Sequence, residues 1–401
     1  MANFRLYFVG QAVSLVGTWM QLVAQSWLVL VLTGSATWVG AVVAVQTLPI
    51  LLLGPYGGVV ADRADKRRLL VVLQVVMGAL ALLLAVLTLT GAVRVWQVLV
   101  LAGLLGCADA FEKPARQAFV IEIVGPEHLR NAVSLNSVMV NAARILGPAA
   151  AGLIIAAGGI GLCFLVNAAS YLPVAVLLVL MDRAALHPSV PQAREPGQVR
   201  AGLAHVRRHP QLAVPLVMMA IIGCFTYEFQ VSLPAMAHTA LSGDARTYGF
   251  MTAAMGVGAV LGGLHTAARG RTGIATMVRS ATGFGVVVLA AAAAPSVTTE
   301  LLALVMVGAA SVSLMARGNS TLQLCADPGM RGRVMALWLV AFQGTTPIGG
   351  PIVGWVAQQA GPRWALVLGA AACFVAAGLG GAALRRIGEG LGVAAPRGIL
   401  P

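Results

Sequence analysis

The chain has 401 residues, of which 59% are apolar and only 10% are charged, whereas a soluble domain averages about 25% charged residues. This composition predicts an integral membrane protein and argues against the chemistry of a soluble enzyme. The formal net charge of +13 could indicate nucleic-acid binding, but a bias of Lys and Arg toward the cytoplasmic side of a membrane explains it better.

Twelve apolar stretches are each long enough to cross a bilayer, which takes about 20 residues. They lie near residues 6–32, 37–60, 69–91, 94–113, 131–157, 159–181, 211–239, 246–268, 273–294, 297–323, 333–360 and 362–384. The first stretch is too long for the apolar core of a signal peptide, so we interpret it as a membrane span. The sequence therefore predicts an all-α integral membrane protein with twelve transmembrane helices.

The basic residues orient these spans. Arg94, Arg246 and Arg363 fall on one side, Arg144 and Arg317 lie inside apolar stretches, and the remaining 21 of the 26 Lys and Arg fall on the other side. The positive-inside rule places that side, and with it both termini, in the cytoplasm. An even number of spans also requires both termini on one side, so the two arguments agree.

The longest break between apolar stretches, residues 182–210, carries five arginines and several prolines. We interpret it as a cytoplasmic linker. Its part near 201–208 is either an interfacial helix attracted to anionic lipid or a plain solvated segment. The linker separates an N-terminal half, 1–181, from a C-terminal half, 211–384, which a cytoplasmic tail, 385–401, follows.

The two halves repeat weakly, with offsets of 201 to 203 residues. Arg130, Val133, Gly147-Pro148 and Gly152 correspond to Arg331, Val334, Gly350-Pro351 and Gly354. This repeat predicts two pseudo-symmetric six-helix halves with a substrate site between them near the midplane.

A short charged segment, GPYGGVVADRADKRR at 54–68, separates the second and third stretches. It resembles the signature loop of the major facilitator superfamily through Gly58, Asp62, Arg63, Lys66 and Arg67. It departs from that pattern at Asp65, which replaces a Gly, and at Val60, which replaces a Leu. The resemblance implies a gating loop whose Asp62 faces the positive N-terminus of the eleventh helix when the cytoplasmic side is closed. From the residues alone, an anchoring loop that only sets topology explains the charges equally well.

Residues 103–152 carry a second distinctive pattern, with NAVSLNS at 131–137. The pattern resembles the siderophore-exporter and macrolide-efflux branch of the superfamily. Gly147, Pro148 and Gly152 are similar to the fifth-span motif of antiporters, in which Pro and Gly let the helix bend and pack tightly. The alternative is a kinked packing helix with no bearing on transport direction.

Ionisable groups inside apolar spans are costly, so Asp109, Glu112, Arg144 and Glu228 are candidates for a proton or charge relay. We expect Asp109 and Arg144 to approach each other in one state, although each could instead reach the cytoplasmic interface alone. Glu228 lies deep in the seventh stretch, where apolar surroundings suit a carboxyl that loads and releases a proton. The alternative for Glu228 is a water-exposed or structurally hydrogen-bonded side chain.

Further polar residues of the spans are candidates for lining the central cavity, or else for packing between helices. They are Gln21, Gln25, Asn136, Asn141, Tyr227 and Gln230. The five cysteines stand apart, without paired spacing, which argues against a metal site or a disulfide framework. We expect no cofactor.

The residues and the resemblance together predict a secondary active transporter of the inner membrane that exports a small molecule, a siderophore or a hydrophobic drug, by alternating access and in exchange for protons. The expected partners are this substrate, protons and the lipid bilayer, with no nucleic acid and no second subunit. Two alternatives remain open. One is an uncoupled facilitator or importer of the same fold, and the other is a non-transporting membrane sensor or assembly partner.

Overall fold

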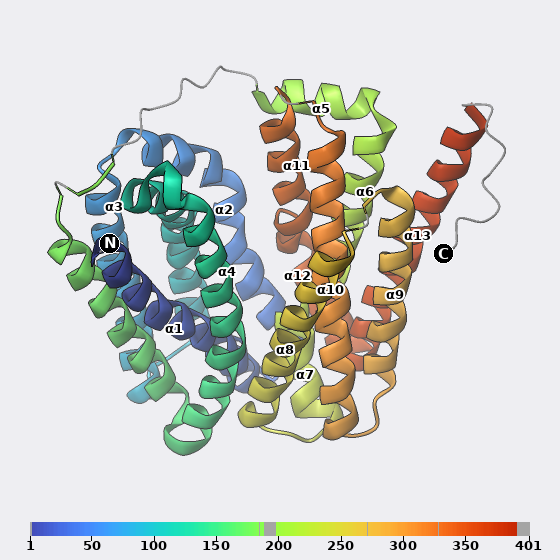
Figure 1. Cartoon of the computed structure of the whole chain (residues 1–401). Helices are drawn as coiled ribbons and strands as arrows, with labels where there is room; N and C mark the ends of the chain where they lie inside the picture. Colours follow the sequence, from blue (N-terminus) through green and yellow to red (C-terminus); the bar gives the residue numbers. More distant parts are fainter. Residues whose placement is uncertain (1, 184, 188–197, 271, 328, 391–401) are drawn as a thin grey trace.

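The computed structural model describes residues 2–183, 185–187, 198–270, 272–327 and 329–390. Within these ranges the regular structure is entirely helical. Figure 1 shows two groups of helices side by side, the first formed by α1–α4 and the second by α6–α13. The short helix α5 lies across one end of the second group, where it contacts α6 and α11.

The first group consists of α1 (Ala2–Thr33), α2 (Ala36–Arg63), α3 (Lys66–Leu89) and α4 (Val95–Leu180). After α5 (Gln198–Arg208), the second group consists of α6 (Pro210–Phe225), α7 (Phe229–Ala235), the π-helical turn η1 (Met236–Ala240), α8 (Ala245–Arg269), α9 (Ile274–Ala293), α10 (Val297–Cys325), α11 (Arg331–Gln343), α12 (Thr346–Gln359) and α13 (Pro362–Gly390).

The long element α4 contains three helical segments. It breaks at Gly125 and Gly159, whose φ angles of 68° and 84° are readily adopted only by glycine. The segments correspond to the fourth, fifth and sixth predicted spans. The sequence predicted that the fourth span ends at residue 113 and that a loop follows it. This prediction was wrong, because the helix continues to residue 124. Lys113 and Arg116 each form an ion pair with an acidic residue one turn earlier, which favours a continuous helix.

The seventh and eleventh predicted spans, 211–239 and 333–360, are each broken rather than continuous. The first break lies between α6 and α7, where the Thr226 hydroxyl donates a hydrogen bond to the carbonyl oxygen of Gly369 at 2.8 Å. The second lies between α11 and α12, just before Pro347. Proline lacks a backbone N–H and its ring clashes with the carbonyl four residues earlier, which here belongs to Gln343, the last residue of α11. This explains why α11 does not run on into α12.

Ten helical stretches of the described chain are long and apolar enough to cross a membrane, and one of them, Glu127–Leu180, has 54 residues. A crossing takes about 20 residues, so this stretch suffices for two. The helices α11 and α12, with 13 and 14 residues, are each too short alone. The all-helical membrane architecture is confirmed, and the count of twelve crossings stays a prediction.

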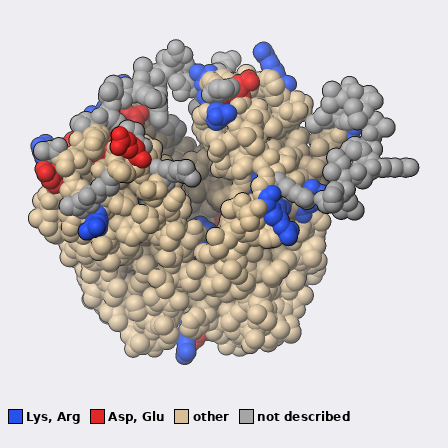
Figure 2. Space-filling view, viewed as in Figure 1, with Lys and Arg blue, Asp and Glu red and all other residues tan. Residues whose placement is uncertain are grey.

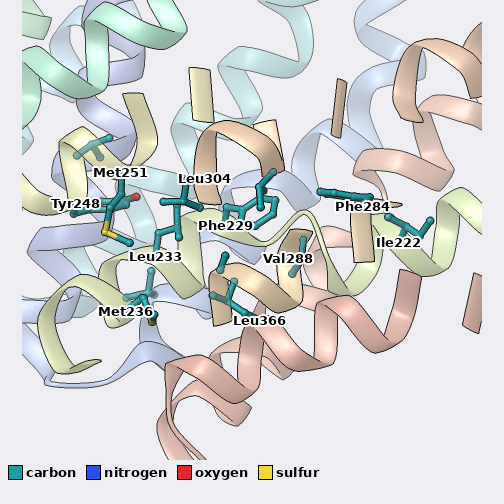
Figure 3. Packing of buried hydrophobic residues seen from close by; sticks show 14 of the residues in the cluster. Ile222, Phe229, Leu233, Met236, Tyr248, Met251, Phe284, Val288, Leu304 and Leu366 are labelled. Carbon is teal, nitrogen blue, oxygen red and sulfur yellow. The ribbon is translucent and has the colours of Figure 1, made fainter. Parts of the chain in front are cut away.

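Uncharged residues, among them many exposed large apolar side chains, cover the sides of the molecule, and the charged side chains gather mainly at one end, where a recess opens between the two groups (Figure 2). This distribution suits a protein whose sides face lipid tails. Buried apolar side chains from α6–α10 and α13 pack around α7 (Figure 3), and they belong to one cluster that also includes side chains of α1–α4.

The two groups meet through backbone that carries no side chain. A Cβ atom on Gly40 of α2 would overlap the carbonyl of Gly350 of α12, and one on Gly354 would overlap the carbonyl of Ala36. Small residues permit such close approach between membrane helices. The Ala36 N–H also donates to the Gln358 side chain at 2.9 Å. We call this contact the α2–α12 seam.

A second seam joins α4 to α8. A Cβ atom on Gly249 would overlap the carbonyl of Pro148 and the backbone of Gly152. Gly152 corresponds to Gly354 in the internal repeat, so the two seams occupy equivalent places in the two halves. Beside this contact, Trp27 of α1 stacks on Tyr248 of α8, with ring centroids 6.3 Å apart.

The α2–α12 seam predicts the effect of Gly40→Leu. The new side chain must displace the α12 backbone, and overpacking of this kind costs about 1–3 kcal/mol. We expect the Tm of the purified protein in detergent to fall by several degrees. A short bifunctional thiol reagent should also cross-link cysteines introduced at Ala36 and Gln358 less efficiently.

The matched control is Gly54→Leu in the same helix, because no atom lies within 4 Å of a Cβ built there. Equal Tm values and equal cross-linking in the two variants would show that the seam does not depend on a bare backbone.

Candidate functional site

The charged loop after α2 is anchored within the first group of helices. The Lys66 Nζ and Glu122 Oε1 atoms are 2.7 Å apart, and both side chains are buried. The Arg67 side chain is also buried and donates to two main-chain carbonyls at the end of α4, those of Leu178, at 2.5 Å, and Val179. The loop is therefore fixed to α3 and α4.

The other residues of the predicted gating loop lie at the end of α2. Gly58 is buried, Asp62 is half-buried and Arg63 is exposed. The backbones of α2 and α4 approach each other closely at Gly57, one residue before Gly58, where a Cβ atom would overlap the carbonyl of Ala110 in α4. The end of α2 and the start of α11 stand apart across the recess (Figures 1 and 2).

The acidic candidates of α4 form ion pairs along their own helix. The Asp109 Oδ2 atom lies 3.1 Å from Lys113 Nζ, and the Glu112 Oε1 atom lies 2.9 Å from Arg116 Nε. Glu112 and Arg116 are mostly buried, and the Tyr7 side chain of α1 lies near both. In this conformation Asp109 is thus paired with Lys113 and not with Arg144.

Arg144 lies near the middle of the second segment of α4. Its Cζ atom is 5.2 Å from the centroid of the Trp19 ring of α1, a cation–π contact. Its Nε atom is buried without a hydrogen-bond partner. Three residues beyond it, Gly147 packs against Trp19, because a Cβ atom there would overlap the Trp19 side chain.

The polar residues predicted to line a cavity are partly used in packing. The Gln25 side chain donates to Gln46 of α2 at 2.9 Å, and Gln21 accepts a hydrogen bond from Asn167. Both glutamines are buried, so these hydrogen bonds hold the first group of helices together. The sequence marked them as polar but could not show that they pair with other side chains.

The other four predicted cavity residues are less buried. Asn136 and Gln230 are half-buried. The Asn141 amide donates to the carbonyl of Ser137 at 2.8 Å, one turn back in its own helix. The Tyr227 hydroxyl donates to the Ser311 carbonyl of α10 at 2.8 Å.

Glu228 occupies the break between α6 and α7, and only 3% of its surface is exposed. Its Oε1 atom has no hydrogen-bond partner. Its Oε2 atom lies 3.6 Å from the position that a Cβ on Gly350 would take, at the α2–α12 seam. The carboxyl also interacts with the side chain of Thr346 in the first turn of α12. Sequence reasoning singled out Glu228 but missed this neighbourhood, because it depends on the break in the helix.

Sequence reasoning also missed Glu300. This residue lies in the first turn of α10 and is fully buried, and neither carboxyl oxygen has a hydrogen-bond partner. Arg363 of α13 is close enough to interact with it electrostatically. An acidic residue at the start of an apolar stretch was the available signal.

The apolar sides, the recess between two joined groups of helices and the few buried charges define a helical membrane transporter. In the described part of the chain, no three His, Cys, Asp or Glu side chains gather in a way that could hold a metal ion. The chain belongs to the transmembrane secretion effector family of the major facilitator superfamily, whose sequence profile matches residues 1–388. The resemblance found in the sequence is thereby confirmed.

Curated relatives include transporters of the same superfamily. The chain is 28% identical to the uncharacterised transporter YfiS of Bacillus subtilis over 44% of this chain and 42% of that one. It is 26% identical to the staphyloferrin A transporter of Staphylococcus aureus over 64% and 65%. It is 27% identical to the multidrug efflux pump Tap of Mycolicibacterium fortuitum over 86% and 87%. The chain thus spans less than two thirds of the first two relatives.

Solved structures share the fold. The nucleoside transporter NupG superposes with a TM-score of 0.78 over 96% of this chain and 100% of its own, at 13% identity. A bacterial homologue of the iron transporter ferroportin, in an inward-facing state, gives a TM-score of 0.74 over 95% and 98%, at 17% identity. At these identities the likeness establishes the fold alone.

The ion pair between Lys66 and Glu122 predicts a large effect of Lys66→Met. Removing one partner of a buried pair costs about 3–5 kcal/mol, because the remaining charge stays buried without it. We expect a marked fall in the Tm of the purified protein. The double variant Lys66→Met/Glu122→Leu should recover most of the loss, since apolar replacement of both partners is often neutral.

The control is Arg68→Met, which removes the exposed pair between Arg68 Nε and Asp65 Oδ2, 3.3 Å apart. Exposed pairs are worth about 0–1 kcal/mol. If Arg68→Met lowers the Tm as much as Lys66→Met, burial of the Lys66 pair is not the cause of its effect.

Proposed function

We propose that the chain is a secondary active transporter that exports a small molecule, a siderophore or a hydrophobic drug, in exchange for protons. The observation that carries the proposal is the buried Glu228 carboxyl beside Gly350, the residue through which α12 meets α2. A proton that neutralises this carboxyl acts directly at a contact between the two groups of helices. Relatives that include an efflux pump and two macrolide efflux proteins support the outward direction.

The proposed membrane is the bacterial inner membrane, with both termini in the cytoplasm. The end of the molecule where charged residues gather then faces inward, as the positive-inside rule requires. The recess at that end makes this an inward-open conformation. We take residues 1–181 and 211–384 as the two moving halves, 182–210 as the linker, 385–401 as the tail, and a monomer as the working unit.

In this mechanism the halves rock about a central site. Closing the cytoplasmic end brings Asp62 toward the start of α11, where the positive end of the helix favours a carboxylate. Lys66 and Arg67, which are held by α4, keep the loop in place during this motion. Opening the outer end separates α2 from α12 and α4 from α8 at the two seams. The proton and the substrate drive the cycle only if each binds the two states with different affinity.

Two alternatives make different predictions. An uncoupled facilitator or importer of the same fold keeps working after a protonophore collapses the proton gradient. A membrane sensor or assembly partner moves no compound when the purified protein is placed in liposomes. The cargo is sought by comparing the compounds that a strain lacking the gene retains with those that the parent strain releases.

Glu228→Gln tests the proton coupling. The amide has nearly the same shape as the carboxyl but cannot take up and release a proton. We therefore expect the variant to lose proton-driven uptake of the cargo compound into inside-out vesicles with an acidic interior. Unchanged coupling would remove Glu228 from the mechanism. The matched control is Glu300→Gln, a second buried carboxyl at the start of α10, which should retain coupling.

A charge exchange tests the proposed approach of Asp109 and Arg144 in the other state. We expect Asp109→Arg and Arg144→Asp each to abolish transport, because each leaves two like charges inside the membrane. The double variant restores the pair with its charges exchanged, so it should again close the cytoplasmic end, measured as protection of a cysteine introduced in the recess from a membrane-impermeant thiol reagent. If that cysteine stays as reactive as in the single variants, the pairing idea loses its support.

A further inference from the structure

Arg144 is a half-buried cation that has no acidic partner in the part of the chain that the structure describes. Its guanidinium lies over the Trp19 ring, at 5.2 Å from Cζ to the centroid. No ion pair joins it to a carboxylate within the described ranges, and its Nε atom makes no hydrogen bond. An arginine cannot escape this situation by losing its proton. The charge therefore stays in the membrane interior without a partner, which is costly.

The acidic side chains of the spans are engaged elsewhere. Asp109 is paired with Lys113 at 3.1 Å and Glu112 with Arg116 at 2.9 Å. Glu228 lies at the α2–α12 seam beside Thr346. The partner that Arg144 lacks must therefore come from outside these helices or from another conformation.

The surroundings of Arg144 belong to both groups of helices. Trp19 and Arg144 come from α1 and α4. The side chain of Tyr227, between α6 and α7, also lies near Arg144. The Tyr227 ring packs edge-on against Phe342 of α11, with centroids 4.9 Å apart. Because the Tyr227 hydroxyl is already bonded to the Ser311 carbonyl, it contributes an aromatic wall and no hydrogen bond to the guanidinium.

We propose that Arg144 binds a carboxylate group of the exported compound, so that the cargo is an organic anion rather than a cationic drug. The planar guanidinium matches a carboxylate through two parallel hydrogen bonds. Trp19 fixes the plane of the guanidinium, and the aromatic rings of Trp19 and Tyr227 offer contact to the apolar part of the compound. An uncompensated cation at this place also repels cationic compounds. This inference rests on the export function proposed above.

The test compares the compounds released by a strain lacking the gene and carrying wild type, Arg144→Gln, Arg144→Lys or Arg246→Gln. Mass spectrometry of the culture medium measures release, and immunoblotting of membranes measures the amount of each variant. Arg246 is the matched control, because its Cζ atom also lies over an aromatic ring, that of Phe250 at 5.7 Å, but the residue is exposed.

We expect the compounds that wild type restores to carry a carboxylate. Per molecule in the membrane, Arg144→Gln should lower their release about 10- to 100-fold, the effect of losing hydrogen bonds to a charged group. Arg144→Lys keeps the charge without the planar fork, so its release should be intermediate. Arg246→Gln should behave as wild type. If Arg144→Gln fails to reach the membrane, the test uses Arg144→Lys and Trp19→Phe instead. Both variants should release less of these compounds per molecule than wild type.

Three results overturn the inference, and they are distinguishable. Restored compounds that are all neutral or cationic contradict it while leaving export intact. Release by Arg144→Gln equal to that by Arg246→Gln contradicts the role of Arg144 but not export. If deletion of the gene changes no compound in the medium, the export function is rejected, and this inference falls with it.

Discussion

At two seams the halves of this protein touch through bare backbone, and the rest of its architecture depends on these contacts. Lipid tails are as apolar as leucine, so hydrophobic burial alone does not hold membrane helices together, and close packing of small residues takes its place. Gly40 against Gly350 and Gly249 against Gly152 provide such packing at equivalent positions of the two halves. Contacts of this kind are either fully made or lost, which suits an interface with two discrete arrangements.

The buried ion pairs differ from the glycine contacts in their location, because they lie within the first half and not between the halves. Lys66–Glu122 joins α3 to α4, Arg116–Glu112 lies along α4, and the buried Arg67 is held by the end of α4. Breaking a buried ion pair is costly, so these interactions resist deformation of the half that contains them. Relative motion of the halves breaks none of them. The buried ion pairs make the first half rigid, and the contacts between the halves are made by glycine backbone. Together these features favour rigid-body motion of the halves at the seams.

The architecture could be predicted well from the sequence because the signals for it are local. Long apolar stretches, the loop around Asp62 and the Gly147-Pro148 motif each show in a short window, and they suffice for the class and the family. It could not show the break that places Glu228 against α12, or the glycine on another helix that Gly350 meets, because both depend on tertiary packing. The buried glutamines of α1 were ambiguous for the same reason, since a polar side chain in a span can face a cavity or another polar side chain.

Glu228, which is buried, and Arg144, which is half-buried, differ in what they can do with their charge. Glu228 can become neutral by taking up a proton, whereas Arg144 remains a cation and must find an anion. If a cargo carboxylate occupies Arg144 in the inward-open state and Asp109 takes its place in the other state, the two anions exclude each other at one guanidinium. Such exclusion gives the cargo the differential affinity that alternating access needs. In the proposed mechanism Glu228 takes up the proton at the seam, and the direction of transport would then follow the proton gradient without direct contact between the two sites.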